Sequence, residues 1–243
     1  MRLAGRICKR AERASRRRDN SVMHSSPADG SPRTDAAAFR SLSPCALADQ
    51  LTGDRVLDFA IRPLWAGMPR VAGPAFPVRC PPGDNLMLHA AIHRAPPGSV
   101  VVVAAGDAHF AVAGGNVCAV AQKRGIAAFV VDGVIRDLAE VRAARFPVFA
   151  RGVSPIPGKK AALDVFNGTV RCGGVEVAPG DMVVADEEGI VVIPLARCAA
   201  VLAAAQAGEA ACPDRDPAQA LADWEAAHRA RIDEILRGRG FAG

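Results

Sequence analysis

Apolar residues recur in two alternating patterns through the middle of the chain. Three short runs rich in β-branched residues have the length of strands buried on both faces, and they lie at 99–105, 126–131 and 147–150. Between them, apolar residues at helical spacing predict helices over 114–124 and 138–144. The order strand, helix, strand, helix, strand predicts right-handed crossovers and a parallel sheet, which places the chain in the α/β class.

Two helices are predicted before this unit. The first covers 43–51 and can be capped by Ser43, and the second begins at Asp84 and ends at Pro96-Pro97-Gly98. The Pro- and Gly-rich passage 62–82 between them predicts irregular chain or short edge strands, and the predicted extended pieces in it are 71–75 and 76–78.

The pattern changes after Gly158. Residues 169–177 are typical of a hairpin, and short apolar runs at 182–185 and 190–193 predict two further strands. We expect this antiparallel portion to pack onto the parallel half. Two Ala-rich helices close the chain, and Trp224 on the second is predicted to be a packing anchor, within the chain or against another subunit.

These patterns divide the chain into a basic tail over 1–42, a folded domain over 43–195 and a C-terminal helical extension over 196–243. The tail is rich in Arg, Ser, Asp and Pro without a sustained apolar period, so we expect it to be disordered. An Arg-rich, acid-poor start is typical of an organelle transit peptide, but it also fits an over-long start with Met23 as the true initiator.

The distribution of charge along the chain limits the classes of partner that we expect. Residues 1–18 hold eight basic side chains against Glu12, so the rest of the chain is about −2 although the whole is +5. Aromatic residues are scarce and Tyr is absent, which also argues against a nucleic-acid partner. Seven cysteines without a CxxC pair indicate reduced thiols in a cytoplasmic protein, and no apolar run approaches eighteen residues, so no membrane span is expected.

The candidate chemistry lies between Gly114 and Glu140. The first N–H groups of a helix that starts at the glycine pair can bind an anion. Arg136 can hold the same carboxylate through its planar fork, and Asp137 can offer oxygen to a divalent cation. The pair follows a buried strand at the carboxyl end of a parallel sheet, where open α/β folds bind ligands. The alternative is a surface Arg beside an Asp that caps the helix over 138–144.

Other polar residues are weaker candidates. Asp107 ends the central strand and either orients a metal ligand or caps the next turn. His89 and His93 share a helix face at a spacing known from zinc sites, but no third ligand follows, so packing imidazoles are the preferred interpretation. His109 is assigned to the rim of the site, and the acidic turn 186–188 is expected to be solvated.

Several segments in this order resemble the RraA-like family over residues 42–195. The segments that carry the resemblance are Gly115 with Arg136-Asp137 and Glu140 at their spacing, GDNLMLHAAI (83–92), FPVFARGVSP (146–155) and ADEEGIVVIP (185–194). The family contains 4-hydroxy-4-methyl-2-oxoglutarate aldolases, oxaloacetate decarboxylases and the regulator of ribonuclease activity A.

The resemblance implies a swivelling β/β/α fold with a partly parallel central sheet, assembled as homotrimers or hexamers with the site between subunits. It implies that a small 2-oxo acid lies against the amides of Gly114, Gly115, Asn116 and Val117. In this reading Arg136 holds the substrate and Asp137 supports Mg²⁺ or Mn²⁺. The implied activity is retro-aldol cleavage or decarboxylation of a pyruvate-containing acid.

One position departs from the family's aldolases, in which an acid stands twenty-one residues before the Arg. Gly115 occupies that place here, so proton transfer is expected to fall to a metal-bound water or to Asp107. The alternative function is that of a non-catalytic regulator which binds a ribonuclease. The methyl-donor glycine loop is absent, and methyl transfer is therefore not supported.

Overall fold

The computed structural model of the protein describes residues 35–210 and 217–241, so most of the predicted tail lies outside the described residues. The folded part nevertheless begins before Ser43. Helix α1 (Ala36–Ser41) is capped by the Asp35 carboxylate, which accepts the N–H groups of Ala37 and Ala38, and its Phe39 is fully buried. The predicted boundary at residue 42 is therefore several residues too late, because a short apolar stretch was hidden among polar neighbours.

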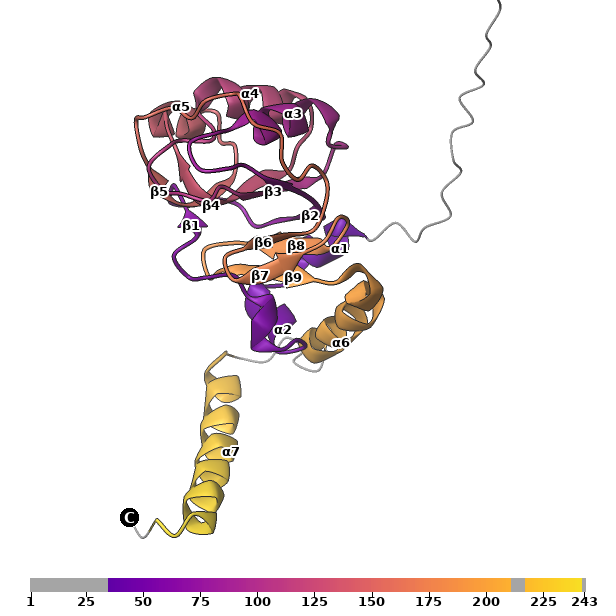
Figure 1. The fold of residues 1–243 in the computed structure, drawn as a ribbon. Helices are drawn as coiled ribbons and strands as arrows, with labels where there is room; N and C mark the ends of the chain where they lie inside the picture. Colours follow the sequence, from indigo (N-terminus) through magenta and orange to yellow (C-terminus); the bar gives the residue numbers. More distant parts are fainter. Residues whose placement is uncertain (1–34, 211–216, 242–243) are drawn as a thin grey trace, which may run out of the picture. The chain divides into compact units, whose positions relative to one another are not determined.

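One seven-stranded sheet organises the chain, with the parallel centre that the sequence predicts (Figure 1). Its strand order is β1-β5-β4-β3-β2-β8-β9, and the strands are β1 (Arg62–Pro63), β2 (Val71–Arg79), β3 (Val100–Ala104), β4 (Ala128–Ile135), β5 (Val148–Val153), β8 (Met182–Ala185) and β9 (Ile190–Ile193). β2, β3, β4 and β5 run parallel, whereas β8 and β9 pair antiparallel.

β2 joins the two portions of the sheet, which the sequence does not predict. Ala75–Arg79 pairs in parallel with β3, while Val71–Pro74 pairs antiparallel with β8. A Cβ at Gly73 would collide with the carbonyl oxygen of Gly98, so glycine is required where the chain passes this turn. The antiparallel portion is thus hydrogen-bonded to the parallel half as well as packed against it.

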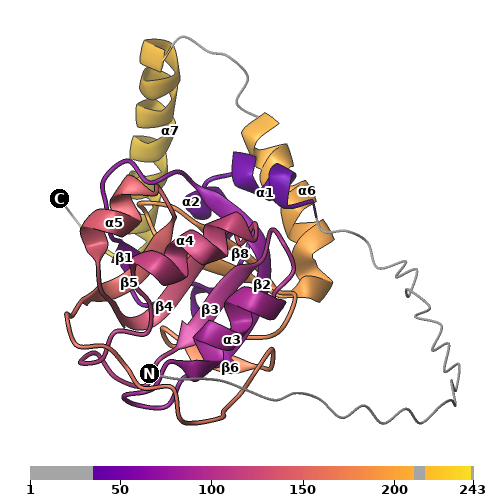
Figure 2. The same ribbon diagram turned by 90° about the horizontal axis from the view of Figure 1, so that it is seen from above.

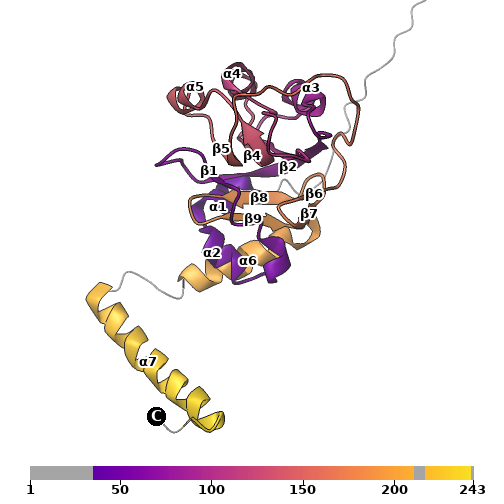
Figure 3. The ribbon, with the colours of Figure 1, turned by 60° about the vertical axis from the view of Figure 1, so that its left-hand side comes forward.

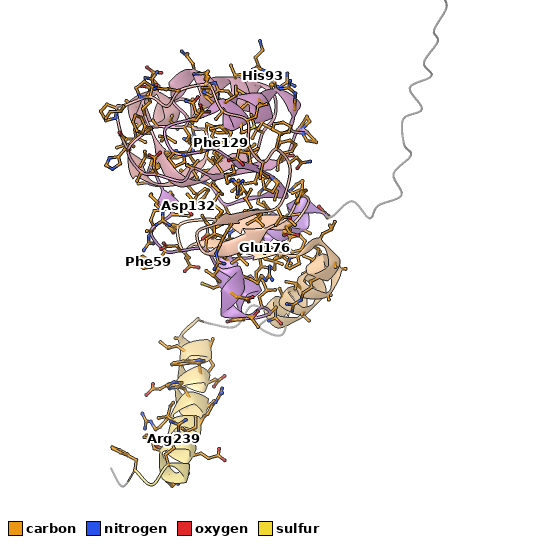
Figure 4. All side chains as sticks on the ribbon, viewed as in Figure 1. Phe59, His93, Phe129, Asp132, Glu176 and Arg239 are labelled. Atoms are coloured by element: carbon orange, nitrogen blue, oxygen red, sulfur yellow. The ribbon has the colours of Figure 1, made fainter. Side chains whose placement is uncertain are left out.

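The elements stack in four layers within the body formed by residues 35–210 (Figures 1 and 3). Helices α3 (Leu86–Arg94), α4 (Gly115–Lys123) and α5 (Leu138–Ala143) cover the parallel strands, as Figure 2 shows from above. Phe129, labelled in Figure 4, belongs to the core between these helices and the sheet.

The opposite face of the parallel strands packs against the antiparallel portion, which includes the hairpin of β6 (Val170–Cys172) and β7 (Val175–Val177). Beneath β8 and β9 lie α1, α2 (Pro44–Ala48) and α6 (Cys198–Ala210). Val201 and Ala205 of α6 are buried there, so the first C-terminal helix belongs to this body. The α/β class and the β/β/α layering expected from the sequence are confirmed.

β4 is longer than predicted. Asp132 and Gly133, which follow the predicted strand over 126–131, lie inside β4, and the register shift between Val131 and Val134 marks a bulge beyond which the strand continues to Ile135. The Arg136-Asp137 pair therefore follows the strand directly.

Helix α7 (Pro217–Gly238) is the last helix of the described chain. No helix among the described residues has both the length and the apolarity to cross a membrane.

Candidate functional site

A small pocket of about 70 Å³ lies where β4 ends and α4 begins. The start of α4 forms one wall, and Arg136 with Asp137 forms a second. Asn85, His89 and Lys160 form the third. Of the predicted binding residues at the start of α4, Gly114, Asn116 and Val117 line the pocket together with the Arg-Asp pair, whereas Gly115 is not part of the lining.

The start of α4 presents bare backbone donors to this pocket. Gly114 is the N-cap in an extended conformation and provides no side-chain cap. The N–H of Gly115 donates to Asp137 Oδ2 over 3.1 Å, and Cys118 N–H donates back to the Gly114 carbonyl oxygen. Within the described chain, the N–H groups of Asn116 and Val117 have no acceptor. Two donors and the positive end of the helix dipole therefore face the pocket.

Asp137 has an unusual backbone for a residue other than glycine, with φ 56° and ψ 40°. Aspartate tolerates this left-handed conformation better than most residues, although the arrangement still carries strain. It precedes α5, but its side chain makes no capping hydrogen bond to that helix. Asp137 is thus the N-cap residue of α5 without capping it through its side chain, because the carboxylate accepts from Gly115 of α4 and lies 3.4 Å from Arg136 Nε.

Because Gly114 has no side chain, Arg136 and Asp137 can lie close to the start of α4. A Cβ there would lie 2.5 Å from Asp137 Oδ2 and 3.0 Å from Arg136 Cγ. The backbone adds a second tie, since Arg136 N–H donates to the Ala113 carbonyl oxygen over 3.0 Å. Arg136 and Asp137 remain 43% and 36% exposed at the side chain, so both can reach a ligand from solvent.

Glu140 occupies the space beside Gly115. A Cβ added to Gly115 would overlap the Glu140 carboxylate and would lie 2.9 Å from Glu140 Cβ. The carboxylate from α5 therefore stands where an acidic side chain at position 115 would have to pass. Sequence reasoning treated Glu140 only as a part of the motif, and its spacing of three residues from Asp137 was the available signal.

The third wall of the pocket was not predicted from the sequence. Asn85 is 4% exposed, and its Nδ2 donates to the carbonyl oxygens of Gly158 and Ala111, whereas its Oδ1 has no hydrogen-bond partner in the described chain. Burial, with the nearby charge of Lys160, lowers the pKa of His89 to about 4. His89 is therefore neutral at pH 7 and can donate or accept a hydrogen bond.

Asp107 does not line this pocket. Its carboxylate accepts the N–H groups of Gly83 at 2.6 Å, His109 at 2.7 Å and Phe110 at 2.9 Å. Partial burial would raise the pKa of Asp107, but these three donors outweigh burial and hold the pKa below its usual value. Of the two roles expected for Asp107, the structure places it in the role that braces a turn.

Other predicted features differ in part. Asp186 is buried and lies 2.8 Å from Arg70 Nε, and Glu188 accepts a hydrogen bond from the Cys45 thiol. The acidic turn 186–188 is therefore not simply solvated.

Burial raises the pKa of the Cys118 thiol to about 12, which leaves no thiolate nucleophile there. No group of three or more His, Cys, Asp or Glu side chains gathers at a metal-binding distance among the described residues.

Comparisons with known proteins agree with this geometry. Residues 44–192 match a family model described as "RraA-like: Aldolase/RraA". A protein of Halalkalibacterium halodurans named "Putative 4-hydroxy-4-methyl-2-oxoglutarate aldolase" is 38% identical over 82% of this chain and 93% of its own length. RraAS2 of Streptomyces coelicolor, described as an unusual member of the RNase ES inhibitor RraA protein family, is 29% identical with a TM-score of 0.65 over 72% of this chain and 91% of its own. The RNA-processing inhibitor RraA of Thermus thermophilis is 27% identical with a TM-score of 0.57 over 63% and 92%.

Proposed function

The chain belongs to the RraA-like family, and we propose that it is a carbon–carbon lyase that acts on a pyruvate-containing 2-oxo acid, such as 4-hydroxy-4-methyl-2-oxoglutarate or oxaloacetate. One observation carries this proposal. The unpaired N–H groups of Asn116 and Val117, the Arg136 guanidinium and the Asp137 carboxylate all border the same small pocket.

The substrate carboxylate binds between the two backbone donors and Arg136. Charge-assisted hydrogen bonds from a planar guanidinium are about twice as strong as neutral ones, and the helix dipole adds to them. Since Gly114 carries no side chain, the carboxylate can approach the amides closely. This end of the substrate is the same for every 2-oxo acid, so it fixes the substrate class.

Asp137 is the residue that would hold a divalent cation. Its Oδ2 accepts from Gly115, whereas its Oδ1 has no hydrogen-bond partner in the part of the chain that is described. A single carboxylate with water suits Mg²⁺ or Mn²⁺, because Mg²⁺ keeps several waters and takes few protein ligands. When bound, the cation supplies Lewis-acid stabilisation of the negative charge that develops on the 2-oxo oxygen.

Glu140 supplies the acid that position 115 lacks. Cleavage of the bond between C3 and C4 leaves the electron pair on the pyruvyl part as an enolate, while C4 becomes a carbonyl carbon in the retro-aldol reaction or leaves as CO2 from oxaloacetate. In the retro-aldol reaction the C4 hydroxyl gives up its proton, and in both reactions the enolate takes a proton at C3 to become pyruvate. The Glu140 carboxyl lies beside the start of α4, and in our proposal it holds or orients that proton. Arg136 offsets the negative charge of the carboxylate while this happens.

The third wall would select the far end of the substrate. Asn85 Oδ1 needs a donor such as a hydroxyl, and Lys160 can pair with a second carboxylate. A neutral His89 adds no further charge at pH 7. Together these groups favour a hydroxylated or dicarboxylic 2-oxo acid.

We also propose that another subunit completes the pocket, in a homotrimer or hexamer. Phe110, Val153 and Ile156 are 37%, 54% and 50% exposed, and Ile156 is hydrogen-bonded to Ala111 of the lining. Exposed apolar side chains around the rim of a polar pocket favour a covering protein surface.

The test is pyruvate release from both acids with and without Mg²⁺. The proposal expects metal-dependent turnover that falls about 10²-fold or more in Glu140→Gln. It also expects the double variant Gly115→Asp with Glu140→Gly to be more active than Glu140→Gly alone, because it places an acid at the same point from α4 and removes the Cβ at position 140 that would collide with it. An unchanged rate in Glu140→Gln contradicts the role of Glu140 but not the lyase.

A second function is favoured by the RraA proteins among the similar structures, one described as an RNA-processing inhibitor and the other as an unusual member of the RNase ES inhibitor RraA protein family. In this case the chain would bind a ribonuclease and leave 2-oxo acids intact. Absence of turnover with both acids, together with tight binding to a ribonuclease, would replace the lyase proposal with this one.

A further inference from the structure

Helix α7 carries an apolar stripe that nothing covers within the described chain. The stripe consists of Leu221, Trp224, His228, Ile232 and Ile235. Spacings of three and four residues keep these side chains on one face of a helix. Leu221 and Trp224 are 64% and 60% exposed, and Ile232 and Ile235 are 38% and 42% exposed.

The stripe has the spacing of a helix pair. Leu221, His228 and Ile235 are seven residues apart, as are successive core positions of a coiled coil. On the same stripe the Trp224 and His228 rings stack, with centroids 4.4 Å apart and planes 14° apart. Since most of the stability of a helix in a protein comes from packing of its apolar face, a partner for this face would stabilise the 22-residue helix.

The charges along α7 indicate which partner fits. Residues 217–227 hold two acidic and no basic side chains, whereas residues 228–241 hold four arginines and two acidic side chains. The helix is therefore about −2 at its start and +2 toward its end. An antiparallel copy places each half against its opposite, and a parallel copy places like against like.

We propose that α7 pairs antiparallel with α7 of a second copy of this chain. The heptad positions are symmetric about His228, so Leu221 of one helix would lie opposite Ile235 of the other. The surface away from the stripe carries the small residues Ala222, Ala226 and Ala230, which offer little apolar area. This contact is separate from the pocket and does not depend on the proposed function.

The test is the mass of the full-length assembly by light scattering at micromolar concentration. We expect Leu221→Asp with Ile235→Asp to halve the mass of the wild-type assembly. The matched control, Ala226→Asp with Ala230→Asp, adds the same charge to the opposite face and should leave the mass unchanged. Equal masses for the wild type and the stripe variant would overturn the proposal, and they are expected if α7 packs on its own chain or on a lipid surface.

Orientation is tested by cross-linking in a background where Cys8, Cys45 and Cys212 are replaced by serine. Leu221→Cys and Ile235→Cys are made in separate chains with tags of different size and then mixed. The antiparallel pair predicts a disulfide between the two differently tagged chains. Disulfides only between identical chains would indicate a parallel pair and overturn the proposal, as would the absence of cross-links.

Discussion

Asp107 and Asp137 follow neighbouring parallel strands, β3 and β4, but the environments of their carboxylates differ. Three backbone N–H groups surround the Asp107 carboxylate within 2.9 Å. Asp137 takes one backbone N–H, stands beside Arg136 and keeps one oxygen without a partner in the described structure. A carboxylate saturated by its own backbone braces a loop, whereas one held at a left-handed residue with an oxygen to spare can bind a ligand.

The largest expected effect separates the two residues by activity. Asp137→Asn keeps a side chain that tolerates the left-handed backbone but removes the charge. We expect kcat/KM for oxaloacetate with Mg²⁺ to fall by about 10²- to 10⁴-fold, while the free energy of unfolding changes by less than about 0.5 kcal/mol. Pyruvate assays and denaturant melts check this, and near-wild-type turnover would remove Asp137 from the site.

The second effect is the reverse, on stability. Asp107→Ala leaves three backbone donors without their acceptor, and water can replace it at the exposed His109 and Phe110, so the free energy of unfolding should fall by about 1–2 kcal/mol. The rate per folded molecule should be unchanged, and Asp107→Asn, which keeps one acceptor, should lose less stability. A large fall in kcat with no loss of stability would restore Asp107 to catalysis.

A smaller effect is expected when the Arg136 guanidinium is replaced by an ammonium group. Arg136→Lys keeps the charge but loses the planar fork, so we expect KM for the 2-oxo acid to rise by about 10- to 10²-fold. The matched control is Arg151→Lys, since Arg151 is paired with Asp58 and Asp132 away from the pocket. If both variants kept the wild-type KM, Arg136 would not contact the substrate.

The smallest effect concerns pH. The pKa of His89 is about 4 in the folded chain against an ordinary value of 6.5, so between these pH values the unfolded chain binds one more proton than the folded chain. Above pH 6.5, His89 is neutral in both states and does not lower the free energy of unfolding. As the pH falls from 6.5 toward 4, protonation of His89 in the unfolded chain lowers the free energy of unfolding by about 1–2 kcal/mol after solvent screening. Denaturant melts should show a shallower pH slope in His89→Gln. Carboxylates with lowered pKa values, such as Asp84 and Asp107, lose their contribution only below about pH 3.8.

Local patterns predicted most of the fold, and tertiary contacts decided the rest. The valine-rich run of β3 and the glycine pair before α4 were legible because burial on both faces and helix starts leave strong local signals. Extended pieces at 71–75 and 76–78 were predicted, but their union in the single strand β2 was not, since two prolines interrupt the segment and its pairing partners lie far along the chain.

The candidate site followed the same division. The spacing of Gly115 and Arg136 can be read from the sequence, and in the structure the start of α4 and the Arg136-Asp137 pair line the same pocket. The part played by Glu140 depends on contact between α4 and α5, and the wall around Asn85 depends on a loop that returns more than seventy residues later. No pattern within one segment reports such contacts.

Calorimetric titration with oxalate in the presence of Mg²⁺ tests the central claim most directly, because oxalate resembles the pyruvate enolate. The account predicts one site per chain, with Kd raised at least tenfold by Asp137→Asn and by Arg136→Lys and unchanged by Asp107→Asn. Oxalate binding that is equally tight in all three variants would show that the anion does not bind between α4 and the Arg136-Asp137 pair.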